Sequence, residues 1–257
     1  MSTAQGQIRM KKIGILGGIG WPSTVEYYAG LCGLAESRNR VQDRAPLPEM
    51  AIESLDLAKA EMLVGSDGDE DSWLAFDAYH REALQRLERS GANFAVIACN
   101  TAHHRLQQIE HGLAIPILGI VDTAADACAE RGVRDVLILG TRTVMASAVF
   151  RETFRQRGID ARAPAEERHR QMVLASIDAL SRGYDDGASR RIRQVIVESG
   201  LHQADSSAAV YLGCTELPLA FPTHKHESLF EVGGIRCINS TALHIQAAFQ
   251  FAIGGSQ

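Results

Sequence analysis

Residues 12–20 read KIGILGGIG, a short apolar run that passes directly into a glycine-rich turn. Such a run is typical of a strand buried on both faces, and the glycines allow the chain to turn tightly after it. Ser23 and Glu26 follow with the spacing of a capping box, so a helix is predicted to begin at Ser23. The stretch therefore predicts the first strand, turn and helix of an α/β domain with a parallel sheet.

The same order of elements continues along the chain and then begins again. Residues 50–55 form the next predicted strand, and apolar residues at helical spacing predict a helix over 73–87. Residues 136–141, VLILGT, resemble residues 13–17, IGILG, and restart the alternation. We interpret the chain as two similar Rossmann-like, parallel-sheet α/β halves in a pseudo-twofold relation, with the active site in the cleft between them.

The two predicted halves divide the chain at residues 120 and 235. Residues 1–120 form the first half and residues 121–235 form the second. The last segment, 236–257, is predicted to pack back onto the first half.

Composition restricts the class of protein. The chain has 257 residues, 46% of them hydrophobic and 22% charged, which is typical of a soluble globular protein. A formal net charge of -5 argues against binding to nucleic acid or to an anionic membrane, and we see no apolar run that could span a membrane and no signal core. The five cysteines form no C-x-x-C pair, and their odd number favours reduced thiols in the cytoplasm and argues against structural zinc.

Two cysteines end apolar runs in equivalent places of the two halves. Residues 95–101 read AVIACNT and residues 210–216 read VYLGCTE, so Cys99 and Cys214 each close a predicted strand just before a small polar run. Backbone N–H groups at the start of a helix would lower the pKa of such a thiol and could hold a substrate carboxylate. The pair therefore predicts two acid/base groups that remove a proton from one face of a carbon and return it to the other. Burial in the core is the alternative, because cysteine packs like a small hydrophobe.

Other signals near the cysteines allow more than one interpretation. His103, four residues after Cys99, could activate the thiol for acyl transfer or serve as a hydrogen-bonded structural group. Glu216 could orient Cys214 or complement the dipole of a following helix. The glycine turn lacks the third glycine of a dinucleotide fingerprint, because Ser23 stands in its place, and this argues against a nicotinamide enzyme.

Taken together, these motifs resemble the aspartate/glutamate racemase superfamily, and the aspartate racemases most of all. The resemblance extends from about Lys12 to about Ala248, and it depends on four blocks: GGIG at 17–20 with Ser23-Thr24, CNTAH at 99–103, GT at 140–141 and GCTELP at 213–218.

The resemblance implies an isomerase, a cofactor-independent racemase that interconverts L- and D-aspartate, or glutamate, without pyridoxal phosphate or metal. Cys99 and Cys214 would be the opposed catalytic bases of a homodimeric enzyme whose partner is a small amino-acid substrate. By the same resemblance, the substrate would be bound by Gly18, Ser23, Asn100, Thr101, Thr141, Thr215 and Glu216. Alternatives are another isomerase, a hydantoin racemase or a decarboxylase of the same superfamily, or a non-catalytic protein that binds a small ligand.

The chain departs from the family where an arginine would bind the side-chain carboxylate of the substrate. In residues 53–59, ESLDLAK, the nearest cation is Lys59, which lacks the two-point fork of arginine. The other candidates are Arg168 and Arg170, after Pro164. We expect Lys59 or Arg168 to take this role.

Overall fold

The computed structural model describes residues 10–42, 47–66, 68–183, 185–201 and 207–254. The chain forms two compact units. The first comprises Met1–Val96, Gln107–Leu118 and Ile245–Gln257, and the second comprises Ile97–Leu106 and Gly119–His244. The chain thus crosses between the units four times. The predicted boundaries at residues 120 and 235 placed residues 97–106 in the first half, whereas this segment groups with the second unit.

The first unit is built on a four-stranded sheet with the order β2-β1-β3-β4. Strand β1 pairs in parallel with β2, and β3 pairs in parallel with β4. The strands are β1 (Ile13–Gly17), β2 (Met50–Ser54), β3 (Phe94–Ile97) and β4 (Ile117–Leu118). The accompanying helices are α1 (Trp21–Gln42), α2 (Leu57–Met62), the 3-10 helix η1 (Glu70–Trp73), α3 (Leu74–Arg89), α4 (Leu106–Ile109), which begins in the second unit, and the C-terminal part of α10 (Ser240–Ala252).

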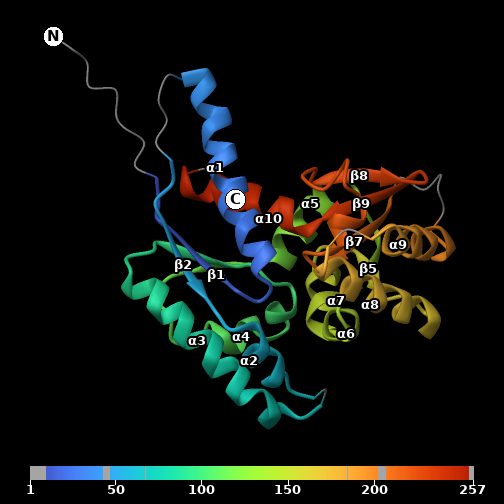
Figure 1. Ribbon diagram of the computed structural model, residues 1–257, viewed down its shortest axis with the longest axis horizontal. Coiled ribbons are helices and arrows are strands. Elements are labelled where there is room, and N and C mark those ends of the chain that lie inside the picture. The colour runs from blue at the N-terminus through green and yellow to red at the C-terminus, as the bar shows by residue number, and fades with distance from the viewer. Residues whose placement is uncertain (1–9, 43–46, 67, 184, 202–206, 255–257) are drawn as a thin grey trace. The chain divides into compact units, whose positions relative to one another are not determined.

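The second unit contains a five-stranded sheet with the order β6-β5-β7-β9-β8, in which only β8 runs antiparallel to its neighbour (Figure 1). Its strands are β5 (Asp135–Gly140), β6 (Asp160–Arg162), β7 (Ala208–Gly213), β8 (Leu229–Val232) and β9 (Ile235–Asn239). Its helices are the 3-10 helix η2 (Thr101–Arg105), α5 (Ile120–Glu130), α6 (Arg142–Ala146), α7 (Ala148–Arg155), α8 (Glu167–Ser181), α9 (Asp186–Glu198) and the 3-10 helix η3 (Leu217–Ala220).

The two sheets repeat one strand order. The strands β5, β6, β7 and β9 correspond to β1, β2, β3 and β4 in chain order. Across each sheet the strands then lie in the order second, first, third, fourth, and β8 is an additional strand at one edge of the second sheet. Cys99 and Cys214 each follow the third strand of this order, as the repeated sequence pattern predicts. The α/β class with two parallel sheets is therefore confirmed.

Alternating side chains of the second sheet enter two hydrophobic cores. Val136 and Ile138 pack in one core with residues of α5 and α7, while Leu137 and Leu139 pack in the other with residues of α8 and α9. Successive side chains of a strand point to opposite faces, so a continuous apolar run is needed when helices cover both. Cys214 belongs to the core of α8 and α9.

The start of α1 differs from the prediction. The helix begins at Trp21, so Ser23 lies inside its first turn and the predicted capping box is wrong. The turn before the helix is held instead by Thr24, whose hydroxyl accepts a hydrogen bond of 2.9 Å from the Gly18 backbone N–H.

No described helix is long and apolar enough to cross a membrane.

We predict that Gly18→Ala destabilises the protein by about 2–4 kcal/mol, because a Cβ at this position clashes with fixed backbone. Gly18 has φ +86°, and an added Cβ would lie 2.2 Å from the Leu55 carbonyl oxygen. Urea unfolding measures the effect. Gly33→Ala is the matched control, since its Cβ meets nothing within 4 Å in the middle of α1, and it should stabilise the protein by about 0.5–1 kcal/mol. Equal effects of the two substitutions would contradict this explanation.

Candidate active site

Cys99 lies two residues beyond β3, where the chain enters the second unit. The backbone N–H groups of Ala102 and Thr101 and the Thr101 hydroxyl lower the pKa of its thiol. The 3-10 helix η2 begins at Thr101, so its first turn supplies these donors. Cys99 is therefore followed directly by a turn that carries hydrogen-bond donors.

Cys214 follows Gly213 at the end of β7 and is 7% exposed. Its thiol donates a hydrogen bond of 2.9 Å to Glu216 Oε2, and the Thr215 hydroxyl donates to the same oxygen at 3.0 Å. Glu216, predicted as a substrate-binding residue or as a group orienting Cys214, thus contacts the thiol directly. Of the roles predicted for it, orientation of the cysteine matches these contacts.

The ionisation of both thiols is governed mainly by burial. Burial raises the pKa of Cys99, the Ala102 N–H lowers it, and the charge of Glu216 raises it. Burial also raises the pKa of Cys214 well above its usual range, followed by the charge and the hydrogen bond of Glu216 and then by the charge of Cys99. The two sulfurs and the carboxylate therefore interact electrostatically within the second unit.

The sequence predicted that helix-start N–H groups lower the pKa of the thiols, but the pKa of both Cys99 and Cys214 is raised. Backbone N–H groups do lower the pKa of each thiol, but burial outweighs them. The segments that follow the cysteines, η2 and η3, are short 3-10 helices, and each contributes only a small dipole.

Two threonine hydroxyls contact each other, and one of them follows closely after Cys99 in the chain. Thr101 Oγ1 is 2.9 Å from Thr141 Oγ1, and the Thr101 hydroxyl also lowers the pKa of the Cys99 thiol. Thr141 is the N-cap of α6 and accepts a hydrogen bond from the Val144 N–H, which fixes its side chain. The structure thus brings together six of the residues predicted for the site: Cys99, Thr101, Thr141, Cys214, Thr215 and Glu216.

Asn100, predicted to bind substrate, turns its side chain into the core of the second unit. Its Oδ1 accepts a hydrogen bond of 2.6 Å from the Tyr211 hydroxyl, and its Nδ2 donates to Ser240 Oγ at 3.2 Å. Ser240 in turn donates to the Leu212 carbonyl at 2.7 Å. The amide therefore ties the Cys99 loop to β7 and to the start of α10, a role that sequence reasoning missed. A tyrosine inside a buried apolar strand was the available signal, because a buried phenol needs a partner.

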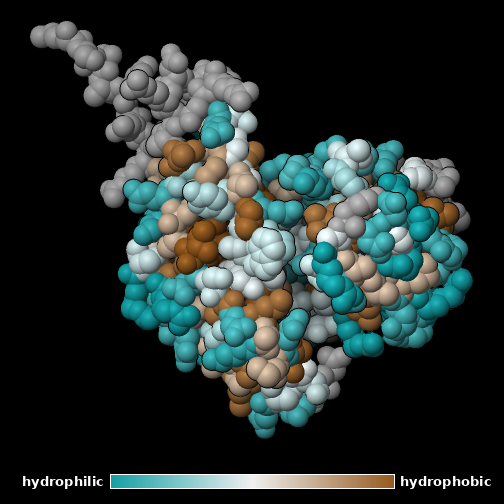
Figure 2. Space-filling model, in the orientation of Figure 1, coloured by the Kyte–Doolittle hydropathy of each residue, from teal (hydrophilic) through white to brown (hydrophobic). Residues whose placement is uncertain are grey.

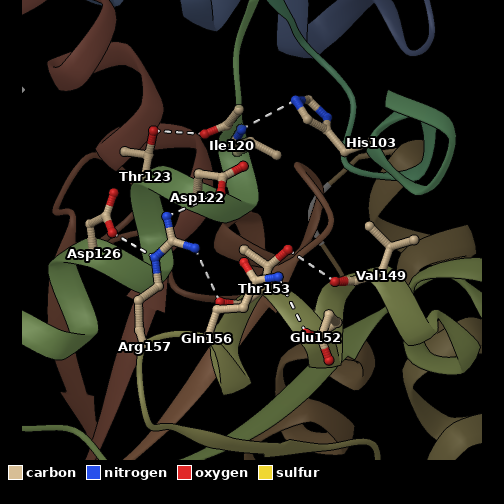
Figure 3. A network of polar contacts seen from close by, with 11 residues as sticks. His103, Ile120, Asp122, Thr123, Asp126, Val149, Glu152, Thr153, Gln156 and Arg157 are labelled. Carbon is tan, nitrogen blue, oxygen red and sulfur yellow. Dashed lines mark hydrogen bonds and ion pairs between the residues drawn. The ribbon is translucent and has the colours of Figure 1, made fainter. Parts of the chain in front are cut away.

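Both ring nitrogens of His103 contact backbone groups, which favours the structural role over activation of the thiol. Its Nδ1 lies 2.8 Å from the Cys99 carbonyl. Its Nε2 lies 3.2 Å from the Ile120 N–H (Figure 3). A carbonyl can only accept and an N–H can only donate, so Nδ1 carries the proton and Nε2 accepts. The ring links the backbone of the Cys99 loop to the first turn of α5.

Helix α5 is fixed in turn by an ion-pair network. Arg157 donates to Asp126 at 2.6 Å and to Asp122 at 3.1 Å, and it also reaches the Thr153 carbonyl (Figure 3). The carboxylates come from α5, while Thr153 belongs to α7. This network stabilises the position of the helix against which His103 is held.

Arg168 and Arg170 form ion pairs at the surface of the second unit. The Arg168 side chain is 60% exposed and pairs with Glu166 and Glu198, and Arg170 pairs with Glu167. Hydrophilic residues predominate on the visible face over α8 and α9 (Figure 2). The partners that the structure describes for Arg168 are the surface residues Glu166 and Glu198. None of these contacts points to the predicted role of Arg168 in substrate binding.

The remaining predicted site residues, Gly18, Ser23 and Lys59, belong to the first unit. Gly18 forms the turn described above, Ser23 is buried in α1, and Lys59 Nζ lies 4.3 Å from the centre of the Tyr79 ring. Within the described ranges, no three His, Cys, Asp or Glu side chains gather as they would around a metal ion.

Comparison with known proteins identifies the family. The sequence profile of Asp/Glu/Hydantoin racemases matches residues 16–248, so the chain belongs to this family. The glutamate racemase of Koribacter versatilis is 26% identical over 168 residues, which cover 64% of this chain and 55% of that protein. The chain thus matches only about half the length of this curated relative.

Two solved structures share the fold. An aspartate racemase homologue from Pyrococcus horikoshii is 26% identical and superposes with a TM-score of 0.71, covering 95% of this chain and 99% of the other. A candidate Asp/Glu racemase from Yersinia pestis is 24% identical with a TM-score of 0.77, covering 95% and 100%.

We predict that Tyr211→Phe destabilises the protein by about 1–3 kcal/mol, because it leaves the buried Asn100 oxygen without its donor. Chemical denaturation measures the loss. The matched control is Tyr79→Phe, which removes a hydroxyl that accepts from the Asp56 N–H in an exposed setting, where water can replace it. A larger loss in the control would refute the buried-polar role of Asn100.

Proposed function

We propose that this protein is a cofactor-independent amino-acid racemase in which Cys99 and Cys214 exchange protons with the Cα atom of the substrate. The observation that carries the proposal is that a partly exposed Cys99 and a buried Cys214 follow equivalent strands and act on each other electrostatically, in a member of this family. The cysteines alone could simply be packing residues, since buried cysteines are common. Family membership alone does not give the reaction, since one family contains several activities. In combination they favour an acid/base pair.

The interaction suits the chemistry because it disfavours two simultaneous negative charges. Ionisation of one thiol raises the pKa of the other, so the pair passes through a form with one thiolate and one thiol. In this form, the thiolate removes the Cα proton of one enantiomer while the thiol donates its proton to the opposite face of the same carbon. The substrate leaves as its mirror image, and the two sulfurs have exchanged protonation states.

The substrate that we propose is aspartate, with glutamate as the second choice. Support comes from the motifs of the aspartate racemases and from the names of the two relatives that are 26% identical, a glutamate racemase and an aspartate racemase homologue. Three hydroxyls in the segments around the cysteines could bind the α-carboxylate and amine: those of Thr101 and Thr141, which contact each other, and that of Thr215, which contacts Glu216. Lys59 and Arg168 stay our proposed ligands for the side-chain carboxylate.

We also propose a cytoplasmic homodimer. All five cysteines are free of disulfide bonds, which supports a reducing compartment, and the dimer rests on the family resemblance alone.

The protein should incorporate solvent deuterium at the Cα of aspartate without any added cofactor. We expect Cys99→Ser and Cys214→Ser to reduce racemisation at least ~100-fold, because a hydroxyl is a far weaker acid than a thiol. NMR of L- and D-amino acids in heavy water measures both exchange and racemisation, and a panel that includes glutamate tests the substrate.

Cys32→Ser is the matched control, because Cys32 lies on α1 outside the cluster. It should retain wild-type activity. Wild-type racemisation by either Cys99→Ser or Cys214→Ser would refute the two-base mechanism, and covalently altered products would favour a decarboxylase.

Activity should rise with pH through the neutral range and reach its maximum on the alkaline side. The active form needs one thiolate, and burial raises the pKa of both thiols above their ordinary value, so this form increases as pH rises. Ionisation of the second thiol then ends the rise. The kcat/KM measured across pH tests this sign, and a maximum below about pH 7 would contradict it, since a free thiol titrates near 8.5.

A further inference from the structure

Glu216 is fixed beside the thiol of Cys214 by convergent hydrogen bonds. The Cys214 thiol and the Thr215 hydroxyl donate to the same oxygen, Oε2, at 2.9 and 3.0 Å. The backbone makes a tight turn here, in which the Leu217 N–H bonds the Cys214 carbonyl at 3.1 Å. This turn brings the carboxylate back to a sulfur only two residues earlier in the chain.

Cys99 has the opposite surroundings. The first turn of η2 begins at Thr101, directly after Cys99, and the N–H groups of Ala102 and Thr101 and the Thr101 hydroxyl lower the pKa of the Cys99 thiol. Donors stabilise a thiolate, whereas an adjacent carboxylate stabilises the thiol and opposes its ionisation. The two cysteines occupy equivalent positions in the repeated strand order, but their partners favour different protonation states.

We propose that Glu216 is a positioning residue that holds a proton on Cys214, so that Cys99 is the thiolate from which the reaction starts. This inference deepens the proposed racemase function and rests on it. For one enantiomer, the thiolate of Cys99 takes the Cα proton, Cys214 gives its proton to the other face, and the charge moves to Cys214. The other enantiomer reacts by the reverse of this step, from the form with the thiolate on Cys214. That state places the thiolate against the Glu216 carboxylate, so a proton returns to Cys214 and one leaves Cys99 before the enzyme is back in its starting form.

Other titratable groups near the two thiols have partners of their own. On η2, His103 bonds the Cys99 carbonyl and His104 bonds Ser147. Helices α8 and α9 pack against η3, and their ionisable side chains include Arg193, which lies over the Phe221 ring, and His169, which pairs with Glu198. The charges that act on the Cys214 thiol are those of Glu216 and Cys99.

The directions of the pKa changes agree with this arrangement. Burial raises the pKa of both thiols. Glu216 raises the pKa of Cys214 by its charge and by its hydrogen bond, but acts on Cys99 by charge alone.

The test is the pH titration of each thiol in Glu216→Gln, read from the Cβ chemical shift of isotope-labelled cysteine. Cys99→Ser and Cys214→Ser assign the signals. In the wild type, Cys99 should lose its proton at lower pH than Cys214. In Glu216→Gln, the pKa of Cys214 should fall by about one to three pH units, because the like charge is removed and the amide can donate to sulfur. The pKa of Cys99 should fall less.

Two controls isolate the effect. Cys128, whose pKa burial raises to about 12, lies in the other core of the same unit and should not move. Glu152→Gln removes an exposed carboxylate of α7 and should leave both thiols unchanged. An unchanged Cys214 in Glu216→Gln, or a wild type in which Cys214 ionises first, would overturn the inference. The titration needs no substrate, so it tests the role of Glu216 separately from the racemase activity. The predicted pKa changes can be absent in an active racemase, and they can be present in a protein that does not racemise.

Discussion

The contact between the buried Cys214 thiol and the Glu216 carboxylate, within electrostatic reach of Cys99, is the constraint on which this site depends. In water each thiol would titrate independently, and a carboxylate two residues away would have little effect. Inside the second unit, the charges of Glu216 and Cys99 both raise the pKa of Cys214. Burial makes every ionisation costly, and it therefore makes the choice of which group ionises sensitive to its immediate hydrogen-bond partners. Because of this sensitivity, donors around Cys99 and an acceptor beside Cys214 have chemical consequences.

The polar groups around the cysteines divide into those that face the sulfurs and those that hold the backbone. Asn100 and His103 carry side chains that are frequent in active sites, yet their hydrogen bonds go to Tyr211, Ser240, the Cys99 carbonyl and the Ile120 N–H. These bonds satisfy buried polar groups and fix the loop after β3, which has little regular structure of its own. Precise placement of an acid/base group requires such support, since a thiol on a mobile loop would not stay aligned with a carbon atom.

The repeated strand order explains how one chain supplies two comparable cysteines. Each sheet reads second-first-third-fourth, and each cysteine follows the third strand. The repetition does not extend to the short segments that follow the cysteines. One continues into Asn100, Thr101 and the donors of η2, and the other into Thr215 and Glu216 before η3. A repeated scaffold thus places two cysteines in different surroundings.

The sequence by itself determined the α/β class, the repeated strands and the placement of the cysteines at strand ends, because apolar runs and their spacing reflect local burial and chain direction. It also carried the motifs by which the family was recognised. The sequence pattern predicted the wrong start for α1, because the turn before this helix is held by a hydrogen bond from the Gly18 N–H to the Thr24 hydroxyl. No sequence pattern predicted this bond. Only the tertiary structure decided that Asn100 faces Tyr211, that His103 is structural and that burial raises the pKa of both thiols. The bonds of Asn100 to Tyr211 and Ser240 and of His103 to Ile120 join residues 17 to 140 positions apart, for which a local pattern contains no information.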